Sequence, residues 1–246
     1  MNHSLNISDA AFQLETPIVL AADEVHVWRV ELAHIAPAEQ RWEPILSADE
    51  RTRAARFHFS RDRQRYTATR ALLRTILAGY TSSDPKELVF HYSKTGKPSL
   101  NSGDGRAVDF NVSHSGQVAL LAFTRGRQVG VDVEQVRENF DHEAIAGRFF
   151  SRQEQGQLAA LPSAERYKGF FRCWTRKEAY IKAEGSGLSL PLHQFDVCLG
   201  PGAGSLLLAT RPDSGEAARW KLCEVPAGDG YVAALCVQGD GWRLKL

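Results

Sequence analysis

The sequence predicts an α+β fold built from two similar α/β halves. Twice along the chain, a segment with the alternation of a strand comes before a long segment with helical periodicity. These pairs are 25–32 with 60–80, and 128–136 with 163–185. A local likeness between 56–66 and 148–158 supports the same reading. We therefore expect a pseudo-two-fold internal duplication whose halves meet near residue 126, with the active site at their interface.

Three segments follow from this division. We expect residues 1–22 to form a loose N-terminal extension, residues 23–126 the first half and residues 127–246 the second half. The N-terminal segment lacks the basic start and the apolar run of a secretion signal, and no stretch approaches the ~18 apolar residues of a membrane helix. The four cysteines form no CxxC pair, which favours a reduced, cytoplasmic protein.

The first half begins with the strand 25–32. Ser47 and Glu50 form a capping box, which predicts a helix from there to about residue 57. The next predicted helix covers 60–80 and has Gly79 near its end. The half then closes with further extended segments: a strand at 87–93, a turn at 94–100, and a strand pair at 107–115 and 117–125.

The second half repeats this order. After the strand 128–136, helical periodicity predicts a helix over 142–161 and a longer one over 163–185 that Gly185 closes. Four short strands follow, at 195–199, 205–210, 219–225 and 231–237.

Charge excludes some partners. The net charge of +1 gives no overall field for a nucleic acid or a membrane. Residues 51–74 nevertheless hold eight arginines against one acid, Asp62. A nucleic-acid face usually combines such a run with interleaved aromatics or a groove-reading motif, and we find neither. We expect phosphate or an acidic protein surface as the partner of this basic segment.

The segment "QVGVDVEQV" (128–136) places two carboxylates side by side. In a strand, Val129, Val131 and Val133 share one face, and Asp132 and Glu134 share the other. Two like charges about 6–7 Å apart repel by roughly 2–3 kcal/mol at an effective dielectric constant of about 20. The pattern has two explanations: an edge strand with a wet face, or a hard cation held between the carboxylates.

The helix that follows carries a second charged group. At 100° per residue, Glu178 and Lys182 stack on one flank of its apolar stripe, and Lys177 falls inside the stripe. Glu178 and Lys182 are either a surface ion pair of little energetic value or part of a site. The stem of Lys177 is expected to lie along the apolar surface with its amine reaching solvent.

Taken together, the motifs resemble those of the Sfp-type 4′-phosphopantetheinyl transferase family. The family strand (I/V)G(I/V)D(I/V)E matches residues 129–134, and the family helix W(T/S)xKExxxK matches residues 174–182. Two further family segments, "TGKPSL" (95–100) and "FNVSHSGQVALLAF" (110–123), occur in the family's order. The resemblance covers roughly residues 47–195.

The resemblance implies an enzyme that transfers the phosphopantetheine arm of coenzyme A to a serine of an apo acyl or peptidyl carrier protein, releasing 3′,5′-ADP. By the same resemblance Asp132, Glu134 and Glu178 hold Mg²⁺ against the pyrophosphate of CoA, and Lys182 contacts the phosphates. Glu178 is then the implied general base, with Glu154 of "SRQE" or a bound water as alternatives. We expect a monomer.

The resemblance also implies contacts to CoA. Ser113 and His114 match family residues at the 3′-phosphate, Arg70 matches an arginine of the long first-half helix, and Lys97 matches a lysine near the adenine. Arg53 lies where the family often has the second of two basic residues. The first of these positions is Glu50 here, which departs from the family pattern.

Two other functions fit an acidic pair beside a lysine. One is a Mg²⁺-dependent phosphohydrolase that acts on CoA-like pyrophosphates without a carrier. The other is a CoA-binding regulatory protein without catalytic activity, which the presence of Asp132, Glu134, Glu178 and Lys182 disfavours.

Overall fold

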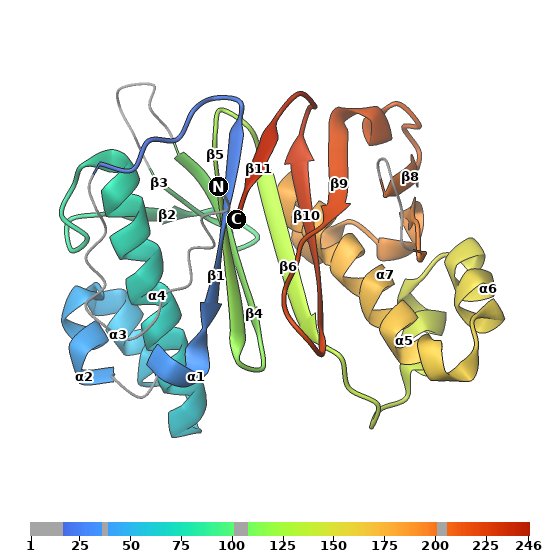
Figure 1. Ribbon diagram of the computed structural model, residues 1–246, viewed down its shortest axis with the longest axis horizontal. Coiled ribbons are helices and arrows are strands. Elements are labelled where there is room, and N and C mark those ends of the chain that lie inside the picture. The colour runs from blue at the N-terminus through green and yellow to red at the C-terminus, as the bar shows by residue number, and fades with distance from the viewer. Residues whose placement is uncertain (1–16, 36–38, 101–107, 201–205) are drawn as a thin grey trace.

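A mixed four-stranded sheet and an antiparallel three-stranded sheet meet in the middle of the molecule, and helices lie on their outer sides (Figure 1). The computed structural model describes residues 17–35, 39–100, 108–200 and 206–246. Residues 1–16, most of the predicted N-terminal extension, lie outside the described residues. The end of that segment packs on the first half: Leu20 is buried in its core, and the backbone N–H of Ile18 donates to the carbonyl of Gly79 (3.0 Å).

The first half contains β1 to β5 and α1 to α4. Its helices are α1 (Leu32–Ile35), α2 (Glu39–Trp42), α3 (Ala48–Ala54) and α4 (Ser60–Thr81), with a 3₁₀ turn at Glu43–Ile45. Its strands are β1 (Glu24–Glu31), β2 (Phe90–Tyr92), β3 (Pro98–Leu100), β4 (Val108–Ser115) and β5 (Val118–Arg125). The predicted capping box of Ser47 and Glu50 is present at the start of α3.

The second half contains β6 to β11 and α5 to α7. Its helices are α5 (His142–Phe149), α6 (Arg152–Ala160) and α7 (Ser163–Glu184), with 3₁₀ turns at Gly187–Ser189, Leu192–Gln194 and Glu216–Arg219. Its strands are β6 (Val129–Gln135), β7 (Phe195–Val197), β8 (Leu207–Thr210), β9 (Trp220–Glu224), β10 (Tyr231–Gln238) and β11 (Arg243–Lys245). Gly185 ends α7 in the left-handed conformation, as predicted.

The two halves repeat one topology, which agrees with the predicted duplication. In each half, one strand of the main sheet precedes a 22-residue helix and two more strands of that sheet follow it. The last of the three pairs antiparallel between the other two. The sheet orders are β11-β1-β5-β4 and β6-β10-β9. The predicted α+β fold class is confirmed. β11, which the sequence analysis missed, adds to the first sheet by pairing parallel with β1.

Two predictions about the second half were wrong in detail. The single helix predicted over 142–161 is two helices, because the chain turns at Ser151, whose side chain caps α6 in a second capping box with Glu154. By topology α6 corresponds to α3, so the capping box at 151–154 corresponds to the one at 47–50. The likeness between 56–66 and 148–158 therefore pairs segments that are not equivalent in the fold.

The core has three layers of apolar contact. One lies between α4 and the first sheet, and another between α7 and the second sheet. The third lies between the two sheets and includes Val129, Val131 and Val133 of β6. Because strand residues alternate, Gly130, Asp132 and Glu134 point the other way, toward α7.

No helix in the described ranges is long and apolar enough to cross a membrane. All four cysteines are free thiols, and Cys173 and Cys236 are buried.

Gly130 sets how closely α7 approaches β6. A Cβ at this position would lie 2.2 Å from the carbonyl oxygen of Ala179 and 2.3 Å from the backbone nitrogen of Ala183. Backbone atoms cannot rotate away as a side chain can, so any side chain at residue 130 must displace the helix.

We predict that Gly130→Ala destabilises the protein by about 1–3 kcal/mol through overpacking. Gly156→Ala is the matched control, because nothing lies within 4 Å of a Cβ at that position in α6. Denaturant unfolding of both variants measures the difference. Equal stability of the two variants would show that the β6–α7 contact is not as close as described.

Candidate active site

The contact of α7 with β6 brings together the side chains that the sequence analysis singled out. Gly130 admits the backbone of α7 at Ala179 and Ala183, which are the neighbours of Glu178 and Lys182 along the helix. Asp132 lies two residues after Gly130 on the same face of β6. The structure therefore unites the two motifs, strand and helix, in one place.

Lys182 binds Asp132. Its Nζ donates to Asp132 Oδ1 (2.6 Å) and also contacts Ser113 Oγ (3.2 Å). Asp132 is only 3% exposed, so its face of β6 is not wet, although β6 is an edge strand of its sheet. The alternative of a surface ion pair between Glu178 and Lys182 is wrong, because Lys182 pairs across the interface with Asp132 instead.

The three carboxylates are electrostatic neighbours. Burial raises the pKa of Glu134, and the negative charge of Asp132 raises it further, against a hydrogen bond from Ser115 Oγ to Glu134 Oε2 (2.6 Å). Burial likewise raises the pKa of Glu178, with Lys182 opposing and the charges of Asp132 and Glu134 adding to the rise. Like charges are thus gathered where water is scarce, which costs stability.

The residues present fit a hard divalent cation. No group of three His, Cys, Asp or Glu side chains stands ready to ligate one within the described part of the chain. Lys182 now neutralises one oxygen of Asp132, but the other oxygen, Oδ2, is buried without a hydrogen-bond partner. An unpartnered buried carboxylate oxygen beside two further carboxylates is the oxygen-rich environment that Mg²⁺ prefers.

Ser113 and His114 lie on opposite faces of β4. Ser113 Oγ donates to Asp132 Oδ1 (2.8 Å), on the side of β6. His114 is exposed on the face toward α4. Loss of hydration around its ring, then the positive charges of Lys182 and Arg65, lower the pKa of His114. Because strand residues alternate, the two side chains point to opposite sides of β4.

A pocket opens beside the N-terminal end of α4. Its volume is about 790 Å³, within the usual range for small-molecule sites. Its walls carry two arginines and two acids, and aromatic side chains supply apolar surface. The lining residues are Asp49, Glu50, Thr52, Arg53, Arg56, Phe57, Tyr66 and Tyr92. The Arg53 guanidinium lies 5.6 Å from the centre of the Tyr66 ring. The pocket can hold a ligand that combines a flat ring with an anionic group.

The comparisons with known proteins identify the family of the chain. Residues 128–236 match a family described as the 4′-phosphopantetheinyl transferase superfamily, and residues 34–125 match one described as 4′-phosphopantetheinyl transferase, N-terminal. The chain is 41% identical over 232 residues to 4′-phosphopantetheinyl transferase HetI of Nostoc sp., which covers 93% of this chain and 94% of that protein. It is 33% identical over 198 residues to 4′-phosphopantetheinyl transferase Sfp of Bacillus subtilis, covering 80% and 84%.

The chain belongs to the 4′-phosphopantetheinyl transferase superfamily. The family resemblance of the motifs is confirmed, and so is the prediction of an enzyme of this class. The two family matches are separated at residues 125–128, where the two halves of the transferase meet.

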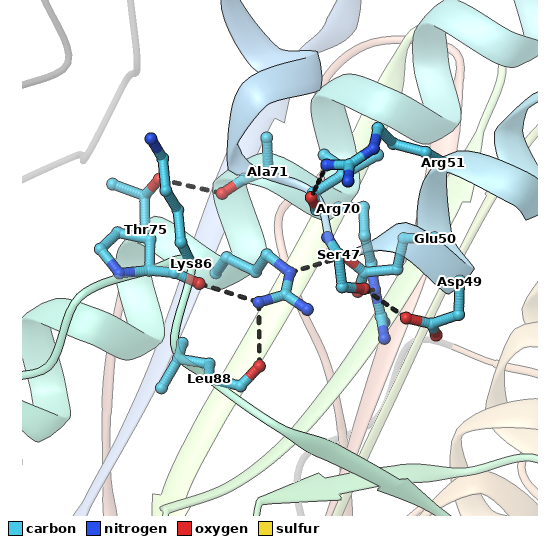
Figure 2. A network of polar contacts seen from close by, with 12 residues as sticks. Ser47, Asp49, Glu50, Arg51, Arg70, Ala71, Thr75, Lys86 and Leu88 are labelled. Carbon is cyan, nitrogen blue, oxygen red and sulfur yellow. Dashed lines mark hydrogen bonds and ion pairs between the residues drawn. The ribbon is translucent and has the colours of Figure 1, made fainter.

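The departure from the family pattern at Glu50 has a structural reason. Glu50 is buried in a network of polar contacts that includes Arg70 (Figure 2). Its Oε1 accepts from Arg70 Nε and its Oε2 accepts from Arg74 Nε (2.6 Å), and both arginines belong to α4. Burial raises the pKa of Glu50, but these hydrogen bonds outweigh it, so the pKa is lowered overall. Arg74 also donates to the carbonyl of Leu88 (3.0 Å). Glu50 therefore fixes α3 on α4.

Arg70 stands at the edge of this network. Besides Glu50, its guanidinium contacts the Tyr92 hydroxyl and lies 4.4 Å from the centre of the Phe90 ring. It is therefore close to the pocket wall at Tyr92, with one side of the guanidinium already bound to Glu50.

Glu154 is the counterpart of Glu50 in the second half. Both are the glutamates of capping boxes, and each binds a basic residue of the following long helix. Glu154 Oε1 lies 2.8 Å from Lys177 Nζ, and both side chains are 0% exposed. Lys177 also donates to the carbonyls of Leu192 and Phe195 (both 2.7 Å). The prediction that its amine reaches solvent was therefore wrong. The structure does not bring Glu154 to the three carboxylates.

Lys97 joins the halves. Its Nζ donates to three carbonyl oxygens: Lys182 (2.6 Å), Ala183 (3.1 Å) and Val129 (3.2 Å). The first two lie in the last turn of α7, where a positive charge also interacts favourably with the helix dipole. In this structure Lys97 holds the segment that carries Lys182.

Two site residues were missed by the sequence analysis. Ser115 binds Glu134, and Arg65 lies near His114. The signal for Ser115 was available, because "NVSHS" places Asn111, Ser113 and Ser115 on one face of a strand. Arg65 was one of eight arginines, and only the packing of α4 against β4 distinguishes it.

We predict that Glu134→Gln stabilises the metal-free transferase at neutral pH. The folded state raises the pKa of Glu134 above its unfolded value, so stability falls as pH rises from the unfolded value through the folded one. A neutral amide at this position does not lose stability in this way. The difference in stability between the variant and the wild type should therefore become smaller at lower pH, where Glu134 itself is protonated.

Thermal unfolding across pH, in the presence of a chelator, measures this effect. Glu138→Gln, an exposed position after β6, controls for the change in net charge. A Glu134→Gln variant that is less stable than the wild type at neutral pH would contradict the charge crowding described above.

Proposed function

We propose that this transferase moves the 4′-phosphopantetheine arm of coenzyme A to a serine of an apo acyl or peptidyl carrier protein. In this reaction the serine oxygen attacks the β-phosphorus of CoA and forms a new O–P bond. The bond from that phosphorus to the bridging oxygen breaks, and 3′,5′-ADP leaves with the bonding electrons. The established family membership supports the transfer, and the site chemistry supports these details.

We propose Asp132, Glu134 and Glu178 as the ligands of Mg²⁺. When bound, Mg²⁺ would neutralise the charge that develops on the pyrophosphate oxygens. The unpartnered oxygen of Asp132 and the raised pKa of Glu134 and Glu178 support this assignment, since each marks negative charge that lacks a partner. A cation at this place would compete with Lys182 for Asp132, and Lys182 would then be able to bind a phosphate oxygen.

Glu178 is the group best suited to take the proton of the carrier serine. It is half-buried on α7, close enough to Lys182, Asp132 and Glu134 for their charges to act on it, so it would lie beside the reacting phosphate. Glu154, the other acid that the family resemblance suggests, has both oxygens engaged in the core by Lys177, Val197 and Ser151. We therefore propose that Glu154 supports the position of α7 rather than accepting the proton.

For CoA binding we propose a path from Lys182 across His114 to the pocket at Arg53. His114 and Arg53 would contact the 3′-phosphate end, with Arg70 at the pocket edge. The support is electrostatic: the charges of Lys182 and Arg65 both act on His114, and the pocket walls carry Arg53 and Arg56. The side chains of Ser113 and Lys97 already form hydrogen bonds within the protein, so we propose that they position the residues along this path.

One observation carries the proposal: the buried Asp132, bound to Lys182 on one oxygen and unpartnered on the other, beside Glu134 and Glu178. Neither the phosphohydrolase nor the regulatory alternative gains support from the geometry or the relatives. The four free thiols fit a reducing, cytoplasmic compartment, and we propose that the transferase acts there as a monomer.

The test is incubation with CoA, Mg²⁺ and a panel of apo-carrier proteins, followed by mass spectrometry. We expect at least one carrier to gain one phosphopantetheine arm and 3′,5′-ADP to accumulate in equal amount. Asp132→Asn should lower kcat by about 10²-fold or more, because it removes charge stabilisation in the transition state.

Asp196→Asn is the control variant. Asp196 is also a buried strand aspartate paired with a basic residue, Arg211, but it lies in β7 away from the carboxylates. It should keep its kcat. Breakdown of CoA without any carrier would favour the phosphohydrolase, and CoA binding without turnover on any carrier would favour the regulatory protein.

A further inference from the structure

The two sheets are joined at β4 and β6 by side chains instead of a backbone ladder. These strands are the facing edges of separate sheets. Three backbone N–H groups of β6 donate to side chains of β4: Val131 to Asn111 Oδ1 (3.0 Å), Val133 to Ser113 Oγ (3.4 Å) and Gln135 to Ser115 Oγ (3.1 Å). We call Asn111, Ser113 and Ser115 the β4 row.

The two serines of the β4 row make a second contact that Asn111 does not make. A serine hydroxyl has one hydrogen, and here its oxygen already accepts a backbone N–H, so the hydrogen is free to be donated elsewhere. Ser113 donates to Asp132 Oδ1 (2.8 Å), and Ser115 donates to Glu134 Oε2 (2.6 Å). Each hydroxyl thus ties a carboxylate to the backbone of the residue that follows it.

We propose that Ser115 is a positioning residue for Glu134. Its hydroxyl fixes Oε2 of the carboxylate and leaves Oε1 as the oxygen for a cation. This inference rests on the proposed role of Glu134 as a ligand of Mg²⁺. Hydrogen bonds to the ligands of a metal commonly change its affinity by 10- to 100-fold, since they hold each ligand in the binding orientation.

The same hydroxyl therefore has two consequences. Its acceptor side docks the second sheet on the first, and its donor side sets the direction of Glu134. The hydroxyl that helps to dock the two halves thus also orients one residue of the proposed cation site. A variant at Asn111 can distinguish these two effects, because Asn111 contributes to docking and contacts no carboxylate of the site.

The test compares Ser115→Ala with Asn111→Ala in the metal-free full chain, titrated with Mn²⁺ in a calorimeter. Mn²⁺ takes the same oxygen ligands as Mg²⁺. We expect Ser115→Ala to weaken Mn²⁺ binding about tenfold or more. Asn111→Ala should lower the melting temperature and leave the affinity unchanged, and Ser115→Thr, which keeps a hydroxyl, should restore the affinity.

Equal changes of affinity in Ser115→Ala and Asn111→Ala, or none in Ser115→Ala, would overturn the inference. Glu134→Ala separates this failure from failure of the proposed function. If Glu134→Ala weakens binding and Ser115→Ala does not, only the role of Ser115 is wrong. If Glu134→Ala also leaves binding unchanged, the proposed ligand is wrong. Should Ser115→Ala not fold, Ser115→Cys answers the question, because a thiol of similar shape donates much more weakly.

Discussion

The close contact of α7 with β6 is the constraint on which the rest of the site depends. It is possible because residue 130 is a glycine, since a Cβ there would lie 2.2 Å from the carbonyl oxygen of Ala179 and 2.3 Å from the backbone nitrogen of Ala183. Because α7 lies so close to β6, Lys182 forms a hydrogen bond with Asp132, and the charges of Asp132 and Glu134 act on Glu178. The same contact that buries apolar surface therefore gathers three carboxylates in a poorly hydrated place. That arrangement costs stability unless positive charge compensates for it.

The duplicated fold supplies the frame, and the two halves use it differently. In both halves the glutamate of a capping box pairs with a basic residue of the long helix, Arg74 in the first and Lys177 in the second. The second half places Asp132 and Glu134 on its first strand toward its helix. In the first half Glu24 of β1 also faces α4, but it is already paired with His26 and Lys245. The first half contributes the β4 row, the basic residues along α4, and Lys97, which binds the end of α7. Each half alone thus holds only part of the site.

Local patterns predicted much of this structure, and long-range contacts account for what they missed. Alternation in "VGVDVE" placed the valines and acids on opposite faces, and the capping box at Ser47 and the period of α4 set helix positions correctly. The break at Ser151, the pairing of β11 with β1, and the burial of Lys177 each depend on partners distant in sequence. The motif match assigned Ser113 and His114 together to the 3′-phosphate, and their side chains lie on opposite faces of β4.

We propose that Asp132, Glu134 and Glu178 form one cation site, in which the negative charges repel one another when no cation is bound. The most direct measurement is the melting temperature with and without Mg²⁺ at constant ionic strength, because a ligand that binds only the folded state raises it. The account predicts a rise for the wild type that Asp132→Asn largely abolishes. No rise in the wild type, or an equal rise in the variant, would contradict it.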